Sequence, residues 1–129
     1  MKLEKEQTLV PEWIKAVEEL KKIRIIRLVG EIGALAVSKL EQFSALSRQQ
    51  KGYEFKHILL DFSEVTLIDS AAVAALLKAL RDYKNTHQKL ALVNLREGPR
   101  NMIRLTKVGH LFPSYATEAQ AIKDLETRF

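Results

Sequence analysis

Near-continuous apolar runs and helix-like periods alternate along the middle of this chain. The runs HILLDF (57–62) and KLALVNL (89–95) are typical of strands that are covered on both faces. Between them, apolar residues recur at the spacing of one helix face, which predicts a helix over residues 70–84 and a polar loop over 63–69. Together the segments predict a strand–helix–strand unit with a right-handed crossover. The apolar face consists of Val73, Leu76, Leu77 and Leu80.

The first third of the chain predicts a hairpin and a helix. IRIIRLVG (23–30) alternates loosely and is interpreted as a strand. WIKAVEEL (13–20) suits either a hairpin partner for that strand or a helical turn or two. Between Gly33 and Gly52, apolar residues share one helical face, so a helix is expected near residues 34–50.

The C-terminal third predicts two further helices around a short strand. Pro99 suits the first position of a helix and Gly109 suits its end. A strand broken by Pro113 is expected next. Thr117 and Gln120 have the spacing of a capping box at the start of a final helix. The apolar face of that helix is expected to consist of Ala119, Ile122 and Leu125.

These elements predict one α/β domain with a mixed sheet of about four or five strands and helices packed against it. The chain has 129 residues, enough for one core. Residues 1–12 are expected to be a flexible segment, and residues 13–129 the domain.

Composition narrows the chemistry. The chain has no cysteine, so disulfides and thiol chemistry are excluded. It shows neither a signal peptide nor an apolar run near the roughly 20 residues that cross a bilayer, so a cytoplasmic protein without membrane insertion is expected. The net charge of +5 is dispersed and is interpreted first as favouring solubility.

An acid and a hydroxyl stand where the helix over 70–84 begins. Asp69 and Ser70 are both residue types that cap helix N-termini, and capping is the simpler interpretation. A helix N-terminus also tolerates phosphate, because it carries partial positive charge and free N–H donors. Ser70 is therefore a candidate phosphoacceptor, provided that its hydroxyl can be reached.

The same helix has a face of small residues opposite its predicted apolar stripe. Ala71 and Ala75 occupy the first turns of this face, and Lys78 and Asp82 follow. Alanine is the best helix former, so helix propensity alone explains this composition. A smooth alanine face also allows another protein to approach closely, which is the second interpretation.

Other functions find less support. His57, His87 and His110 are scattered without metal-ligand spacing, and no Gly-rich phosphate loop or nucleophile elbow is present. The acids Asp61, Glu64 and Asp69 are interpreted as capping and solvating groups, so no metal, cofactor or enzymatic activity is expected. A basic strip after Pro99 suits a solvated face, a nucleic acid, an acidic partner or a nucleotide phosphate. It consists of Arg100, Arg104 and Lys107.

The stretch HILLDFSEVTLIDSAAVAALL (57–77) resembles the signature of the STAS domain, the fold of anti-sigma factor antagonists. RIIRLVGEI (24–32) is similar to an early strand of that family. KLALVNL and the segments down to EAQAIKDL (118–125) are similar to its later strand and helices. About 100 residues correspond in order.

The resemblance implies a bacterial, non-enzymatic regulator of sigma-factor-dependent transcription. Such a protein binds a switch kinase that is also an anti-sigma factor, which phosphorylates the serine of the Asp-Ser pair, here Ser70; a serine phosphatase reverses this. No nucleic acid partner is implied. The surface that contacts the kinase is expected to include Glu31, Ser63, Asp69, Ala71, Ala72, Ala75 and Lys78. The alternative is a STAS-type scaffold or accessory subunit without a phosphorylation switch, in a stress-signalling assembly or a lipid-transport ATPase.

The chain departs from the family pattern at three places. Ala72 stands where the family commonly has glycine. Gly33 stands where it often has aspartate, close to the phosphorylation loop. The early helix and the segment up to Gly52 are also long.

Overall fold

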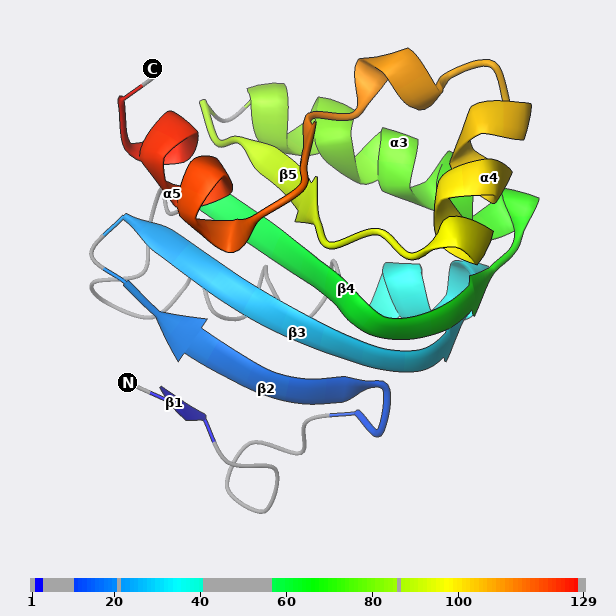
Figure 1. The fold of residues 1–129 in the computed structure, drawn as a ribbon, viewed down its shortest axis with the longest axis horizontal. Coiled ribbons are helices and arrows are strands. Elements are labelled where there is room, and N and C mark those ends of the chain that lie inside the picture. Colours follow the sequence, from blue (N-terminus) through cyan, green and yellow to red (C-terminus); the bar gives the residue numbers. More distant parts are fainter. Residues whose placement is uncertain (1, 4–10, 21, 41–56, 86, 128–129) are drawn as a thin grey trace.

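The protein is an α/β domain built on one mixed sheet (Figure 1). The structure, a computed structural model, describes residues 2–3, 11–20, 22–40, 57–85 and 87–127. Six strands follow one another across the sheet in chain order. They are β1 (Lys2–Leu3), β2 (Ile14–Glu19), β3 (Ile23–Ile32), β4 (His57–Ile68), β5 (Leu90–Val93) and β6 (Ser114–Tyr115).

The sheet changes direction at β3. Strands β1, β2 and β3 pair antiparallel, whereas β4, β5 and β6 run parallel to β3 and to one another. The predicted hairpin over residues 13–30 is therefore confirmed, with β2 as its first strand. The predicted parallel strand–helix–strand unit is confirmed too. Strands β4 and β5, which precede and follow one helix in the chain, pair directly with each other. Lys2–Leu3 pair with β2, so two residues of the segment expected to be flexible lie in the sheet.

The helices cover both faces of this sheet. Residues 34–40 are helical, and the rest of the helix predicted over 34–50 lies outside the described residues. The others are α3 (Ser70–Asn85), α4 (Glu97–Leu105), the 3-10 turn η1 (Gly109–Leu111) and α5 (Glu118–Thr127).

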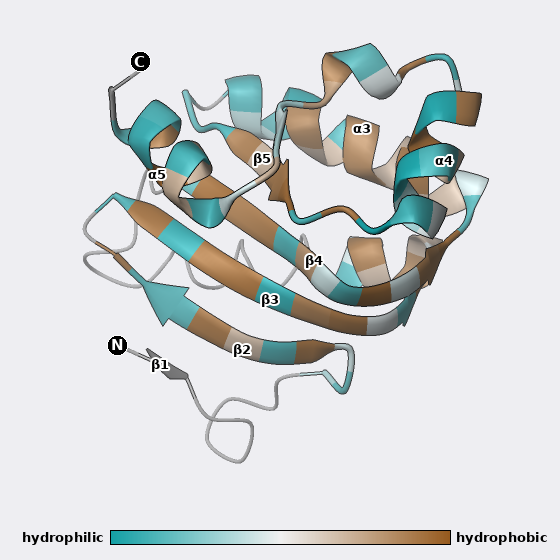
Figure 2. Cartoon of the chain, viewed as in Figure 1, coloured by the Kyte–Doolittle hydropathy of each residue, from teal (hydrophilic) through white to brown (hydrophobic). Residues whose placement is uncertain are grey.

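The larger core lies between the sheet and α3. It contains Ile26 and Leu28 of β3, Leu60 of β4 and Val73 and Leu76 of α3, all nearly inaccessible to solvent. Along the strands the hydrophobic colour predominates but is interrupted by hydrophilic bands (Figure 2). Burial of this apolar surface is the main stabilising contribution to the fold.

A smaller core lies on the opposite face of the sheet, under α5. Ile23 and Ile25 pack there with Leu59, and α5 contributes Ala121 and Leu125. The prediction that Ala119 belongs to the apolar face of this helix is wrong, because Ala119 is exposed and Ala121 is buried. The buried residues Ala121 and Leu125 are four residues apart and therefore lie on one face of the helix. The Gln120 N–H does donate to Thr117 Oγ1 (3.3 Å), as the capping box predicts.

Strand β4 is twice as long as predicted. The expected loop over residues 63–69 is wrong for all but its last residue, because β4 continues to Ile68. It stays paired with β3 as far as Ile32↔Ile68, across two irregularities in register. Its second half exposes Ser63, Glu64, Thr66 and Leu67 and buries only Val65 and Ile68. The strand therefore delivers the chain directly to the start of α3.

Helix α4 begins and ends earlier than predicted. Pro99 occupies its third position instead of its first, and the helix stops at Leu105. Gly109 lies beyond it, in η1, where the position of an added Cβ would be 3.0 Å from atoms of Ile103. Gly109 therefore allows the chain to pass close behind α4.

Candidate functional site

Of the two residues that could cap α3, Asp69 and Ser70, it is Asp69 that does so. The Ala72 N–H donates to Asp69 Oδ1 (2.7 Å), and the Val73 N–H donates to the Asp69 carbonyl oxygen (3.1 Å). This is the arrangement of an N-cap, so Asp69 caps α3. Ser70 is the first residue of the helix and is exposed, and its hydroxyl has no hydrogen-bond partner among the described residues. The hydroxyl is thus reachable, as a phosphoacceptor must be.

The exposed face of α3 is rotated from the one predicted. Ala71 and Lys78 are exposed as expected, and Lys78 pairs with Asp82 four residues on (3.2 Å). Ala74, which the sequence analysis did not select, is exposed between them. Ala75 is half-buried against the larger core, so it contributes only in part to this face.

Ala72 does not lie on the predicted surface. Its side chain is 0% exposed and belongs to the core beneath α3, so the expectation that it contacts a partner is wrong. The side chains that face the sheet come from Ala72, Leu76, Ala79 and Tyr83 together with Val73. An alanine at the start of this stripe brings the helix close to the strands.

Residues of β3 and β4 border the helix start. Glu31 is exposed and is the register partner of Leu67, which is 50% exposed. Gly33 follows β3 and lies beside the Asp69 carboxylate. Leu35, two residues further along, is 70% exposed. Leu67 is thus two residues from Asp69 in the chain, and Leu35 is two residues from Gly33. Sequence reasoning missed Leu67 because it placed that residue in a polar loop.

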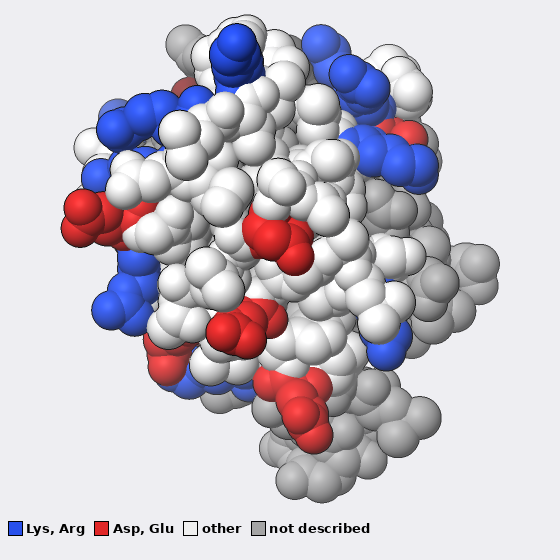
Figure 3. Space-filling model, turned by 90° about the vertical axis from the view of Figure 1, so that its right-hand side faces the viewer, with Lys and Arg blue, Asp and Glu red and all other residues white. Residues whose placement is uncertain are grey.

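We define the Ser70 face by its exposed residues: Glu31, Leu67, Asp69, Ser70, Ala71, Ala74 and Lys78. The space-filling view of this end of the molecule shows mostly uncharged atoms in the middle, interrupted by separate acidic groups (Figure 3). Lysine and arginine side chains lie towards the margins of that view.

Ser63 is in a different environment from Ser70. Its N–H donates to Asp61 Oδ1 (3.0 Å) and its hydroxyl donates to Asp61 Oδ2 (3.2 Å). At about 3.3 Å per strand residue, β4 separates Ser63 from the helix start by up to roughly 20 Å. The structure therefore does not bring Ser63 together with Ser70.

Asp61 belongs instead to an ionic cluster centred on Arg27. The Arg27 guanidinium contacts Asp61 (2.8 Å), Glu118 (2.8 Å) and Glu18 (2.6 Å), and so joins β3 to β4, α5 and β2. Hydrogen bonding to Glu118 is the largest cause that raises the pKa of Arg27 above its usual value. Of the three carboxylates, that of Asp61 is buried, whereas those of Glu18 and Glu118 are partly exposed.

The pKa of Asp61 is lowered in this cluster. Burial alone would raise it, but the hydrogen bonds from the Ser63 N–H, Arg27 and the Asn94 amide together outweigh burial. Asp61 is therefore ionised and fixed, which is a structural role. Within the described residues, no group of three histidine or acidic side chains is arranged to hold a metal ion. No helix of the described part of the chain has the length and apolar character needed to cross a bilayer.

Solved structures show the same fold in other proteins. A putative anti-sigma factor antagonist from Thermotoga maritima is 21% identical, with a TM-score of 0.73, over 85% of this chain and 92% of that one. The anti-sigma factor antagonist SpoIIAA in its unphosphorylated form is 22% identical, with a TM-score of 0.68, over 88% and 96%. SpoIIAA from Bacillus in its phosphorylated form is 23% identical, with a TM-score of 0.59, over 83% and 95%.

The family comparison agrees with the fold. The model of the STAS domain matches residues 15–121, which include every strand from β3 to β6 and the helices α3 and α4. The parallel β4–α3–β5 unit and the Asp-Ser pair at the helix start fall within this match. The chain therefore belongs to the STAS domain family.

Proposed function

We propose that this protein is a non-enzymatic antagonist of an anti-sigma factor and that phosphorylation of Ser70 controls it. The observation that carries the proposal is the division of roles at the start of α3. Asp69 supplies the cap, so the exposed Ser70 hydroxyl is not needed to hold the helix. In this role the protein supplies a surface and a phosphoacceptor, and it binds the anti-sigma factor so that a sigma factor is released for transcription.

Phosphate at Ser70 would change the Ser70 face strongly. It adds about −1.5 to −2 charges and three acceptor oxygens at neutral pH. The N-terminus of α3 accommodates this charge, because the first helical N–H groups and the helix dipole favour an anion there. A docked partner would meet a bulky, charged group beside Asp69 and amid the exposed methyl groups of Ala71 and Ala74. The modification therefore blocks close contact while it leaves the fold intact.

The replacement of the family glycine by Ala72 is compatible with this role. The side chain of Ala72 is 0% exposed and points into the core. A methyl group in this position adds nothing to the surface that a partner would touch. Approach of a partner is controlled by the neighbours Ala71 and Ala74, which are exposed and small.

The proposal assigns the chemistry to two partners. A kinase that is itself the anti-sigma factor transfers phosphate from ATP with magnesium to Ser70, and a serine phosphatase removes it. All three proteins would act in the cytoplasm. Neither nucleic acid nor a membrane takes part in the proposed contact.

To test the switch, the partner is first recovered from the native cells and identified. We expect it to be an ATP-binding kinase. Its affinity is measured for the unmodified chain, Ser70→Ala and Ser70→Asp. We expect Ser70→Ala to bind like the unmodified chain and Ser70→Asp to bind at least about tenfold more weakly, a loss of about 1.4 kcal/mol. Ala119→Asp adds the same charge on the exposed surface of α5 and should leave binding unchanged. Equal binding of Ser70→Ala and Ser70→Asp would contradict the switch and favour the scaffold alternative.

The position of the contact is tested by bulk instead of charge. Ala74 is a better position for this test than Ala75, because Ala75 packs partly against the core. Ala74→Trp should abolish kinase binding, and Ala119→Trp on α5 should not. Thermal unfolding of both variants would show that the domain is intact. Retained binding by Ala74→Trp would show that the exposed face of α3 lies outside the contact.

A further inference from the structure

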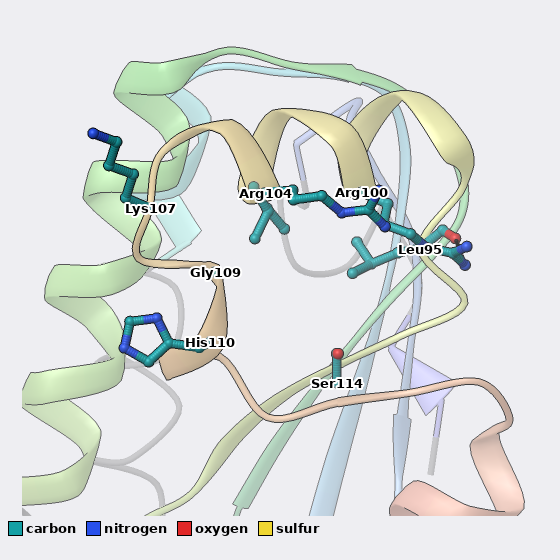
Figure 4. A pocket seen from close by; sticks show the side chains of 8 residues that line it. Leu95, Arg100, Arg104, Lys107, Gly109, His110 and Ser114 are labelled. Carbon is teal, nitrogen blue, oxygen red and sulfur yellow. Dashed lines mark hydrogen bonds between the residues drawn. The ribbon is translucent and has the colours of Figure 1, made fainter.

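A pocket of about 370 Å³ lies between α4 and the chain that follows it. Its polar lining comes from Arg100, Arg104 and Lys107, from His110 of η1 and from Ser114 of β6. Figure 4 shows the Arg100 and Arg104 side chains lying along α4, with the Ser114 hydroxyl directed towards that helix. Every charged or titratable group among these is a base.

The bases of this pocket lack acidic partners in the described part of the chain. Neither Arg104 nor Lys107 forms an ion pair or side-chain hydrogen bond there, and His110 forms none. Arg100 donates only to the Leu95 carbonyl oxygen (2.9 Å). By contrast, Arg27 contacts three carboxylates, so arginine is paired with acidic side chains elsewhere in the same domain.

The arrangement of the bases on α4 is unfavourable by itself. Arg100 and Arg104 are four residues apart within α4, while Arg96 directly precedes the helix and Lys107 follows its end. Like charges at this spacing lie on one helix face and destabilise a helix by a few tenths of a kcal/mol per pair. An anion seated among them would turn this repulsion into attraction.

We propose that this pocket binds a small phosphate-bearing anion, either inorganic phosphate or a compact phosphomonoester. A guanidinium group presents parallel N–H donors that match two phosphate oxygens, and two such groups are available here. The Ser114 hydroxyl offers a further donor from the opposite wall. The volume is near the lower end of the range of about 300–1,000 Å³ for ligand pockets, which favours a small ligand.

A solvated basic helix face explains these residues less well than a bound anion does. A solvated face needs no hollow beneath it and no hydroxyl from another element. A nucleic acid also fits poorly, because no phenylalanine, tyrosine or tryptophan lines the pocket for stacking. The inference concerns a second site and does not depend on the function proposed for Ser70.

The test measures anion binding by the whole chain at fixed ionic strength. Inorganic phosphate and glycerol 3-phosphate are titrated separately, with chloride balanced, and binding is followed by backbone amide NMR shifts and by thermal unfolding. We expect saturable shifts confined to α4, η1 and β6, and a rise in unfolding temperature that saturates with the same dissociation constant. Comparison of the two titrations distinguishes free phosphate from the phosphomonoester as the preferred ligand.

Variants place the binding at the arginines. Arg104→Gln should weaken binding by about ten- to a hundredfold, as expected for the loss of a charge-assisted hydrogen-bonding group. Arg104→Lys keeps the charge but loses the paired donors, so it should bind with intermediate strength. Arg81→Gln removes an exposed arginine from α3 and should bind like the unmodified chain.

The same variants give an independent reading in the absence of the anion. Because Arg104→Gln relieves repulsion along α4, it should unfold at the same or a slightly higher temperature in chloride. Shifts spread evenly over exposed lysines and arginines, or equal binding by Arg104→Gln and Arg81→Gln, would overturn the proposal. Tighter binding of polyglutamate or an RNA oligonucleotide than of either phosphate would overturn the choice of a small ligand.

Discussion

One carboxylate oxygen of Asp69 lies 3.7 Å from the position that a Cβ atom on Gly33 would occupy. The other oxygen of the same carboxylate accepts the Ala72 N–H and caps α3. Residue 33 is therefore placed to act on the cap of the helix that begins with Ser70. A side chain there has room, because this separation is an ordinary van der Waals contact.

A second carboxylate at residue 33 should weaken the cap by repulsion. We expect Gly33→Asp to be less stable than Gly33→Asn by about 1 kcal/mol at neutral pH and low salt, the scale of two like charges about 4 Å apart in water. Urea unfolding at low and high ionic strength measures this difference, which should shrink in high salt. An Asp–Asn difference that is independent of salt would show that charge is not the cause.

The cap itself should depend on Asp69 and not on Ser70. Asp69→Ala removes the acceptor of the Ala72 N–H and should lower the free energy of unfolding by about 1 kcal/mol. Ser70→Ala should change it by less than about 0.5 kcal/mol, because the hydroxyl has no partner in the described part of the chain. Asp69→Asn retains an acceptor and serves as the control. A large loss in Ser70→Ala would show that the hydroxyl is structural.

Two neighbouring alanines of α3 should respond oppositely to added bulk. Ala72→Leu forces a larger side chain into the core and should cost about 1–3 kcal/mol. Ala74→Leu places the same side chain in solvent and should change stability by less than about 0.5 kcal/mol. Chemical denaturation of both variants under identical conditions gives the comparison. Similar losses at both positions would contradict the orientation of α3 described above.

Asp61 should contribute stability that depends on pH in the acid range. Its pKa is lowered in the fold by hydrogen bonds to its ionised form, so its contribution is complete above its unfolded pKa of about 3.9 and is lost as the pH falls through the lower, folded value. Asp61→Asn should therefore cost about 1.5–3 kcal/mol at pH 7 and less at pH 3. Urea titrations at several pH values measure this. A cost that does not change between pH 7 and pH 3 would exclude a charge-dependent role.

The sequence indicated the fold well where burial is continuous. HILLDF and KLALVNL contain almost only apolar side chains, so they could be identified as strands inside the sheet, and both are. The second half of β4 escaped notice because Ser63, Glu64 and Thr66 are exposed and look like a loop. What holds them in a strand is pairing with β3, which is distant in sequence.

The Ser70 face was anticipated only in part, for a physical reason. A methyl group fits both a tight core and a surface, so alanine carries little information about burial. The helical period therefore placed Ala75 outside and could not show that Ala72 is inside and Ala74 outside. Ser70 and Asp69 could be predicted because their types and order are specific to a helix start.

The ionic cluster and the basic pocket depend on contacts that no local pattern records. Arg27 meets Glu118 from an element 91 residues later in the chain. The basic strip that begins on α4 was visible as a spacing, but Ser114 contributes to its pocket from β6. Tertiary contact, not local sequence, decides both sites.

The length of β4 affects how a partner would distinguish the phosphorylated protein from the unphosphorylated one. The strand remains hydrogen-bonded to β3 up to the residue before Asp69, so the backbone that presents Ser70 is already ordered before any partner arrives. Little conformational entropy remains to be lost on this side of a complex. The partner would then recognise the modification on a surface that is already rigid and that differs between the two states by a single phosphate group.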